Sequence, residues 1–116
     1  MSTAAIEKKN VNQPDNVIRF EKGELATVTV DGCTVARAVF QPGWRWSEHV
    51  GAASGQRLCN TAHLGYVVSG RLMVQMSDGA RIEMGPGDVA LIWPGHDGWT
   101  VGDEPCVFLE FPPPVV

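Results

Sequence analysis

Short apolar stretches separated by turn-forming residues run along this chain from Val17 to Phe111, and they constrain its fold more than any other feature. The stretches are rich in Val, Ile, Thr, Trp and Phe, and clusters of Gly, Pro, Asp and Asn separate them. This alternation is typical of an all-β sandwich or barrel, and no segment after Val17 shows helical periodicity. A length of 116 residues is enough for one domain. The sequence therefore predicts a single all-β domain.

Turn residues divide the apolar stretches into ten expected strands. Asp31-Gly32 and Asp78-Gly79 predict hairpins, because these residues tolerate the positive φ of tight turns. A bulged loop at Asp78-Gly79 would pair Val74 with Ile82, and a two-residue loop at Ser69-Gly70 would join the strands on either side of it. The expected strands cover residues 17–20, 24–30, 33–41, 44–50, 61–69, 71–76, 81–84, 88–93, 98–101 and 106–111.

The ends of the chain differ in composition from the middle. Residues 1–16 are polar and are expected to form a tail or an arm, whereas residues 17–116 are expected to form the barrel domain. No apolar segment follows a basic start, so no signal peptide is expected and we predict a cytoplasmic protein. No stretch approaches the roughly 20 apolar residues of a membrane span, which predicts no membrane partner.

Charge and cysteine content narrow the partners further. Nine Lys and Arg stand against thirteen Asp and Glu, and a net charge of −4 lacks the basic footprint of a nucleic-acid-binding protein. We therefore expect no nucleic-acid partner. Cys33, Cys59 and Cys106 are odd in number and widely spaced, which favours reduced thiols over a disulfide framework.

Strand alternation predicts which side chains share a face. Arg45 and Ser47 would lie on the face of His49 and line a pocket suited to an anionic group, although Arg45 is equally compatible with an exposed position. The tryptophans Trp93 and Trp99 are candidates for a pocket wall, whereas two others, at 44 and 46, would lie on the opposite face in packing or subunit contacts. The inward face expected from the Ser69-Gly70 hairpin consists of His63, Gly65, Val67, Leu72, Val74 and Met76.

Three histidines, His49, His63 and His96, each stand at or near the end of an expected strand. Imidazoles from separate strands of a barrel can form a facial metal site that leaves positions open for water or substrate. The alternative is that each is a packing or hydrogen-bonding residue of a barrel without metal, because none of the close pair spacings of zinc fingers or metalloproteases is present.

Gly43 precedes His49 with five residues between them, His63 precedes Gly70 with six between them, and the segment 85–96 reads GPGDVALIWPGH. This spacing resembles the cupin superfamily, in particular its small single-domain members. Their first motif runs glycine, five residues, His-x-His, a variable loop, glutamate, six residues, glycine. Their second motif runs glycine-aspartate, a strand, Pro-Gly and a histidine. The chain shows Gly43, His49, His63 and Gly70 in the first motif and the segment 85–96 in the second. The resemblance implies a jelly-roll β-barrel with a cavity that commonly holds a divalent metal ion, often in a dimer.

The resemblance also shows where this chain departs from the usual three-histidine, one-glutamate ligand set. Gly51 stands in the place of the second histidine, His63 in the place of the glutamate, and Gly98 in the place of the last histidine. His96 lies two residues earlier, on the same face of the strand. We expect His49, His63 and His96 to be the metal ligands.

Cys59 and Glu48 are the candidates for a fourth ligand or for a group that supports the ligands. Cys59 would favour zinc or another thiophilic metal, and its alternative role is a buried thiol in the loop. Strand alternation argues against Glu48, because adjacent residues of a strand face opposite ways and Glu48 would lie on the face opposite to His49. The cofactor predicted by the resemblance is a divalent ion of zinc, iron, nickel or manganese.

Two main functions are compatible with these residues, beside a third in which the barrel is purely structural and serves only to form a dimer. The first is a metal-dependent enzyme that acts on a small organic molecule as an isomerase, cyclase, lyase or dioxygenase. The second is a non-catalytic module that binds or senses a small molecule without metal, because fold does not determine chemistry. A homodimer is expected in either case, through edge pairing of residues 17–20.

Overall fold

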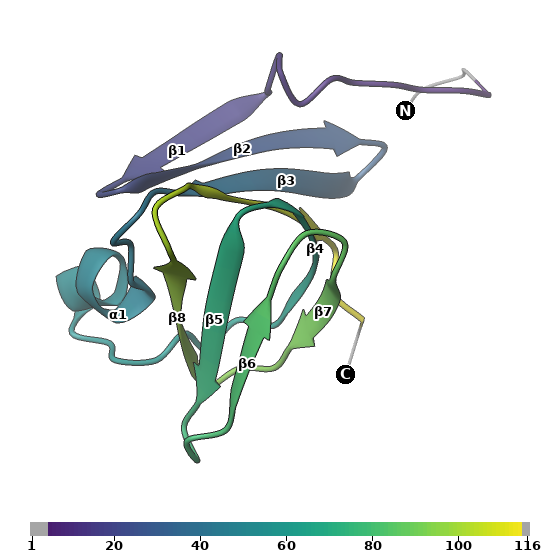
Figure 1. Cartoon of the computed structure of the whole chain (residues 1–116). Helices are drawn as coiled ribbons and strands as arrows, with labels where there is room; N and C mark the ends of the chain where they lie inside the picture. Colours follow the sequence, from purple (N-terminus) through teal and green to yellow (C-terminus); the bar gives the residue numbers. More distant parts are fainter. Residues whose placement is uncertain (1–4, 115–116) are drawn as a thin grey trace.

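The computed structural model describes residues 5–114, and in this part of the chain nine strands form two antiparallel sheets (Figure 1). The larger sheet has the order β1-β2-β3-β9-β4-β7, and the smaller has the order β6-β5-β8. Together they form the jelly-roll barrel that the sequence predicts. The elements are β1 Asn16–Phe20, β2 Gly23–Val30, β3 Cys33–Phe40, α1 Trp46–His49, the 3-10 helix η1 Gly51–Ser54, β4 His63–Ser69, β5 Arg71–Met76, β6 Arg81–Met84, β7 Val89–Ile92, β8 His96–Val101 and β9 Cys106–Phe111.

The core lies between the two sheets, as their alternation of side chains requires. Ala38, Phe108 and Val67 stand on neighbouring strands of the larger sheet in matching register, and all three are buried. Leu72 and Val74 of β5 approach them from the smaller sheet and belong to the same buried cluster. The inward-facing side chains of both sheets therefore line one interior.

The chain changes sheets at Gly70, and the hairpin expected at Ser69-Gly70 is therefore wrong. Strand β4 pairs with β7 and β9, whereas β5 pairs with β6 and β8. Gly70 has φ of 74°, and a Cβ there would lie 2.1 Å from the carbonyl oxygen of Pro105. Only glycine fits both the turn and this close approach. The expected inward residues Val67, Leu72 and Val74 are nevertheless buried, from two sheets rather than one.

The other two predicted hairpins are confirmed. Val30 pairs with Cys33 across the two-residue turn between β2 and β3. Val74 pairs with Ile82 across the β5–β6 loop, as the bulged register predicts. Ile82 itself is 70% exposed, because β6 is an edge strand of the smaller sheet.

The strand expected over residues 44–50 is wrong, because the structure places the helix α1 there, followed by η1. The carboxylate of Asp97 on β8 accepts a hydrogen bond from the Ser47 backbone amide at 3.0 Å and another from its hydroxyl at 2.8 Å. The first amides of a helix have no partner within it, so a carboxylate at this position stabilises the turn. Alternation arguments based on a strand consequently fail for this segment.

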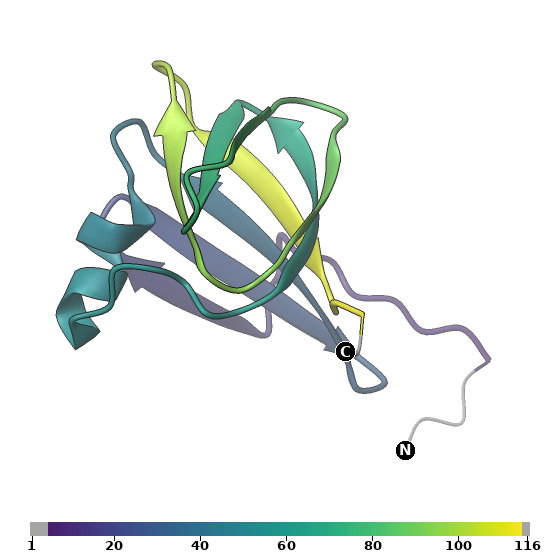
Figure 2. The ribbon, with the colours of Figure 1, turned by 90° about the horizontal axis from the view of Figure 1, so that it is seen from below.

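The chain before β1 extends beyond the sheets, as Figures 1 and 2 show. Its described part is nevertheless tied to the barrel: the Asn12 side-chain oxygen accepts a hydrogen bond from Arg37, and the Asp15 carboxylate accepts one from the Thr29 amide at 2.9 Å. Residues 1–4 of the expected arm and residues 115–116 of the expected domain lie outside the described part. Among residues 5–114, no helix has the length and hydropathy to cross a membrane.

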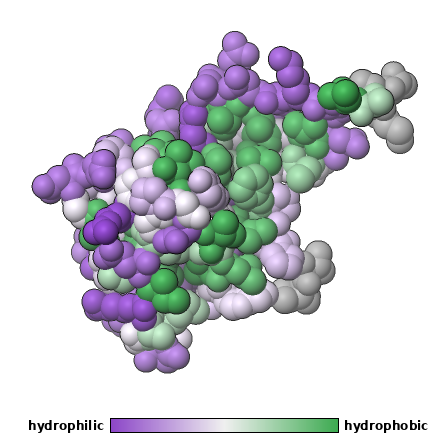
Figure 3. Space-filling view, turned by 45° about the vertical axis from the view of Figure 1, so that its right-hand side comes forward, coloured by the Kyte–Doolittle hydropathy of each residue, from purple (hydrophilic) through white to green (hydrophobic). Residues whose placement is uncertain are grey.

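Apolar side chains also gather on the outer side of the larger sheet, on the face turned to the viewer in Figure 3. Tyr66 pairs with Val89 on this side, and both are exposed. Leu91 and Phe111 flank Leu64 in the next row and are exposed as well. The outer face of β4, β7 and β9 is therefore much less polar than an ordinary solvent-facing sheet.

Replacing Gly70 with alanine should destabilise the protein by about 2–5 kcal/mol, the sum of a left-handed backbone penalty and a steric clash with Pro105. Urea unfolding measures this change. Gly85→Ala is the matched control, since a Cβ at Gly85 meets no atom within 4 Å, and its effect should stay within about 0.5 kcal/mol. Equal stabilities of the two variants would contradict the sheet crossing at Gly70.

Candidate metal site

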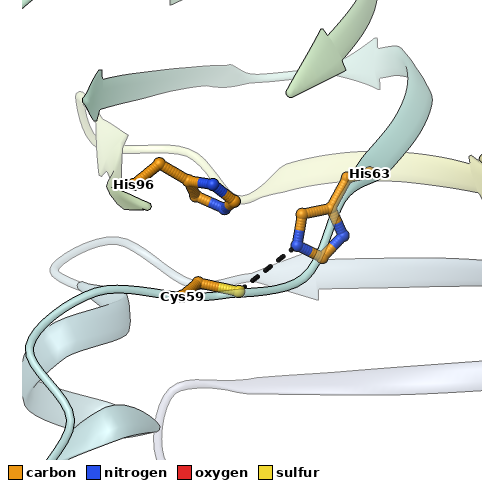
Figure 4. Close-up of side chains that lie close together, drawn as sticks. All are labelled: Cys59, His63 and His96. Atoms are coloured by element: carbon orange, nitrogen blue, oxygen red, sulfur yellow. Dashed lines mark hydrogen bonds between the residues drawn. The ribbon is translucent and has the colours of Figure 1, made fainter. Parts of the chain in front are cut away.

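Three potential ligands from separate segments meet at one end of the barrel. Cys59 lies in the loop before β4, His63 is the first residue of β4, and His96 is the first residue of β8. One donor atom from each residue lies within 4.8 Å of the other two, and the close-up in Figure 4 shows both rings turned toward the thiol. Cys59 and His96 are buried, and His63 is partly buried.

Backbone hydrogen bonds explain why Cys59 and His96 meet. The Cys59 amide donates to the carbonyl oxygen of His96 at 2.7 Å, and the Gly95 amide donates to the carbonyl oxygen of Cys59 at 2.7 Å. This isolated β-bridge holds the loop against the start of β8. The pairing of His63 with Ile92 brings the start of β4 to the same end of the barrel.

Each histidine ring is oriented by an oxygen on its Nδ1 side. The Nδ1 of His63 is hydrogen-bonded to the carboxylate of Glu110, and the Nδ1 of His96 lies 2.7 Å from the carbonyl oxygen of Trp93. A carbonyl oxygen only accepts, so Nδ1 of His96 donates this hydrogen bond and its Nε2 is the nitrogen left for the ligand group. Oxygen acceptors behind imidazoles are the usual support of metal-binding histidines.

The thiol and the His63 ring shift each other's protonation in the metal-free protein. Burial by itself raises the pKa of the Cys59 thiol, but hydrogen bonds with His63 and His96 outweigh it and lower the pKa to about 6. Burial by itself lowers the pKa of His63, but hydrogen bonds to Cys59 and Glu110 raise it to about 9. At neutral pH the pair is therefore a thiolate beside an imidazolium.

Cys106 shows what burial does without such partners. It is fully buried in the core, and burial raises the pKa of its thiol to about 11. Both thiols and the exposed Cys33 are free in the structure. Only a thiolate ligates a metal ion, so Cys59 is chemically ready for this role and Cys106 is not.

The donor set fits a tetrahedral metal ion. Zinc bound at about 2.3 Å by sulfur and about 2.0 Å by nitrogen would separate these atoms by roughly 3.5 Å. The Sγ of Cys59 and the Nε2 of His63 lie 3.5 Å apart. The remaining pairs lie within 4.8 Å, so modest side-chain rotation would bring all three donors to one ion. Three protein ligands leave the fourth position open.

A cavity of about 170 Å³ adjoins these histidines inside the barrel. His63, His96 and Glu110 provide its titratable groups, and the rest of its wall is largely aliphatic and aromatic. Among the residues expected to line a pocket, Leu72 and Val74 do so. The other wall residues are Phe20, Leu25, Phe40, Trp44, Trp46, Val50, Ile92, Gly98 and Phe108.

The structure does not bring His49 to the other two histidines. Its Nδ1 accepts a hydrogen bond from the Arg45 amide at 2.9 Å, and its Nε2 lies 3.1 Å from the carboxylate of Glu21. His49 is part of α1 rather than of a strand, so its side chain follows a helical direction. The neighbouring Glu48 is also on α1 and is not among the grouped ligands of the described residues.

The other expected pocket residues lie elsewhere. Arg45 is 3.3 Å from the Asp97 carboxylate, and its guanidinium lies 4.0 Å from the centre of the Trp99 ring. The hydroxyl of Ser47 donates a hydrogen bond to the same carboxylate. Val67 is fully buried in the core beside the cavity, whereas Met76 and Trp93 line a separate groove near β6 and β7.

Sequence reasoning missed Glu110, Trp44 and Trp46. Glu110 is two residues after the buried Phe108 on β9, so a charge at an inward position of an apolar strand was the available signal. The two tryptophans were assigned to the opposite face because residues 44–50 were expected to be extended. They line the cavity because the chain bends into α1 between them.

The motif spacing fits a second frame that agrees better with the geometry. Starting at Gly51 instead of Gly43, five residues lead to Arg57 and Cys59, which take the places of His-x-His. His63 keeps the place of the glutamate. In this frame Cys59 and His63 both stand at ligand positions of the motif, in accord with their proximity.

Comparisons with known proteins agree with the barrel. The chain is 11% identical to the ectoine synthase from P. lautus, with a TM-score of 0.68 over 96% of this chain and 80% of that one. It is 16% identical to a Rhizobium leguminosarum protein of unknown function, with a TM-score of 0.64 over 97% of this chain and 100% of that one.

The oxalate decarboxylase from Bacillus subtilis is 27% identical, with a TM-score of 0.58 over 84% of this chain. This chain spans only 27% of the length of that protein. No functionally curated protein sequence matches significantly. The sequence profile described as the cupin domain matches residues 39–112, which is more than half of the chain. The chain therefore belongs to the cupin family, as a small cupin domain.

Proposed function

We propose that this cupin binds a divalent metal ion, preferably zinc or a similarly thiophilic ion, through Cys59, His63 and His96. The supporting observation is the convergence of three donors on one point with an oxygen acceptor behind each ring. One thiolate and two imidazoles suit zinc better than the harder ions. The set replaces the three histidines expected from the sequence, with Cys59 in the place of His49.

The open coordination position would serve a small organic molecule. His63 and His96 belong to both the ligand group and the cavity wall, so a molecule in the cavity would reach the ion. When bound, such an ion polarises a carbonyl group or lowers the pKa of a water molecule. Glu110 would hold the Nδ1 proton of His63 and keep the ring in its ligating orientation. Isomerase, cyclase, lyase and dioxygenase chemistry are each compatible with this arrangement.

The second candidate function is a binding or sensing module without metal. The hydrogen-bonded chain from Cys59 through His63 to Glu110 satisfies its polar groups with no ion present. In that case the cavity alone would provide the function, and the thiolate–imidazolium pair would be a structural ion pair. Metal analysis distinguishes the two candidates.

Protein purified without a histidine tag and supplied with zinc should bind about one ion per chain by elemental analysis. His63→Ala should lower the zinc affinity at least tenfold, because it removes a ligand and the ring that holds the thiolate. His49→Ala is the matched control and should bind zinc normally, since His49 lies at Glu21. A wild type without stoichiometric zinc, or equal losses in both variants, would refute this site.

The ionisation of Cys59 in metal-free protein gives an independent check on the geometry. The ultraviolet thiolate absorbance that separates wild type from Cys59→Ser should appear with a midpoint near pH 6, because His63 lowers the pKa of this thiol. The absorbance should be fully present above the midpoint and lost as the pH falls through it. Cys106→Ser should produce no difference below pH 9, and a midpoint near pH 9 for Cys59 would contradict the contact with His63.

We also propose that the chain forms a homodimer by pairing β1 with β1 of a second copy. β1 is an edge strand of the larger sheet, so it has unpaired backbone groups on one side. Light scattering should then give twice the 12.5 kDa mass of the chain. Ile18→Pro, which removes an amide from this strand, should shift the mass toward the monomer, whereas Leu91→Lys tests the apolar outer face. Loss of the dimer only with Leu91→Lys would move the interface to that face.

A further inference from the structure

The cavity is the size of one aromatic ring. An engineered protein cavity of about 150 Å³ lined by apolar side chains holds a benzene molecule. The volume here is about 170 Å³, and Phe20, Phe40 and Phe108 contribute rings to its wall. A molecule larger than a ring with a short substituent would either extend out of the cavity or displace these side chains.

The charged groups of the cavity wall disfavour the binding of a molecule that carries a carboxylate. Its wall contains no lysine or arginine among the described residues, and its carboxylate, Glu110, is bonded to His63. Arg45, the cation expected to bind an anionic ligand, is turned toward Asp97 and Trp99. The charged ring of His63 is already paired with Cys59 and Glu110, so a carboxylate that did not reach the metal ion would lose its hydration with no unpaired cation in exchange.

Trp44, one of the residues of the cavity wall, carries a buried polar atom without a partner. The Nε1 of Trp44 is buried and makes no hydrogen bond within residues 5–114, and the residue as a whole is 4% exposed. The ring is held in place because it stacks on Phe40 at 4.0 Å and its backbone bonds to Gln41 and Thr100. A buried donor of this kind is unfavourable until an acceptor satisfies it. Tryptophan N–H groups usually find such a partner when buried.

We propose that the cavity binds a neutral, single-ring aromatic molecule that carries a hydrogen-bond-accepting oxygen. This proposal rests on the proposed function for the role of the metal ion, since the oxygen would reach either the ion or the Trp44 N–H. The ring would pack among the aromatic and aliphatic side chains of the wall. Recognition would come from shape and apolar contact, with one polar group fixing the orientation.

A substitution at Gly98 would fill the cavity without changing the proposed metal-binding residues. It lines the cavity on β8, and a Cβ there would lie 3.3 Å from the Met73 carbonyl oxygen and 4.0 Å from Val74. A Cβ is thus accommodated with a small adjustment of its neighbours. The added methyl groups of Gly98→Val would occupy the space proposed for the ring, with His63 and His96 unchanged.

The test uses metal-free full-length protein and three probes: acetophenone, ethylbenzene and oxalate. Acetophenone should raise the melting temperature and quench tryptophan fluorescence at concentrations at least tenfold below any effect of oxalate. Ethylbenzene, which lacks the oxygen, should bind about three- to tenfold more weakly because one hydrogen bond is lost. Trp44→Phe should remove this preference for acetophenone while retaining an aromatic wall.

The Gly98→Val variant keeps the test decisive if Trp44→Phe fails to fold. It should weaken acetophenone binding at least tenfold and leave zinc affinity unchanged, with Gly85→Val as the control away from the cavity. Oxalate binding as tight as acetophenone binding, or no effect of Gly98→Val, would overturn the proposal. Zinc binding without acetophenone binding would overturn only this inference, whereas acetophenone binding without zinc binding would overturn only the metal site.

Discussion

The site depends on one backbone contact, the β-bridge between Cys59 and His96. Two hydrogen bonds of 2.7 Å hold the loop before β4 against the start of strand β8. β4 belongs to the larger sheet and β8 to the smaller, so this bridge fixes the distance between donors that the two sheets carry. His63, four residues after Cys59, is then within reach of both. The side chains meet because the backbone is pinned, and their own hydrogen bonds only refine the geometry.

Local signals were enough to predict the barrel and two of its hairpins, but not the pairing of distant strands. The turns at Asp31-Gly32 and Asp78-Gly79 carry their geometry in adjacent residues, and the structure confirms both. The turn at Gly70 looks alike in sequence, yet it leads from one sheet to the other. Its outcome depends on β4 pairing with β9, some 40 residues later, and on the approach of Pro105. No local pattern encodes such a contact.

The same distinction separates the predicted ligands from the missed ones. His63 and His96 lie on true strands and were identified, and Cys59 was recognised as a candidate because of its spacing from His63. His49 was wrongly grouped with them because alternation was applied to a segment that Asp97 turns into a helix. Strand alternation predicts side-chain direction only where a strand exists. Here the carboxylate of Asp97, which is distant in sequence, stabilises a helix in place of the expected strand. The inward-facing Glu110 could have been found by strand alternation.

The two buried thiols of this chain, Cys59 and Cys106, differ greatly in their readiness to react with oxidants. Thiolates are oxidised far faster than thiols, so Cys59 is the cysteine whose ionisation favours attack by peroxide, whereas the deeply enclosed Cys106 is inert. Conversion of Cys59 to a sulfenic acid would remove a soft sulfur donor and break the contact that keeps the His63 ring charged. A bound ion would shield that sulfur. Oxidation in air would therefore inactivate the metal-binding group of the metal-free protein faster than that of the metal-bound protein, and a reductant would preserve it.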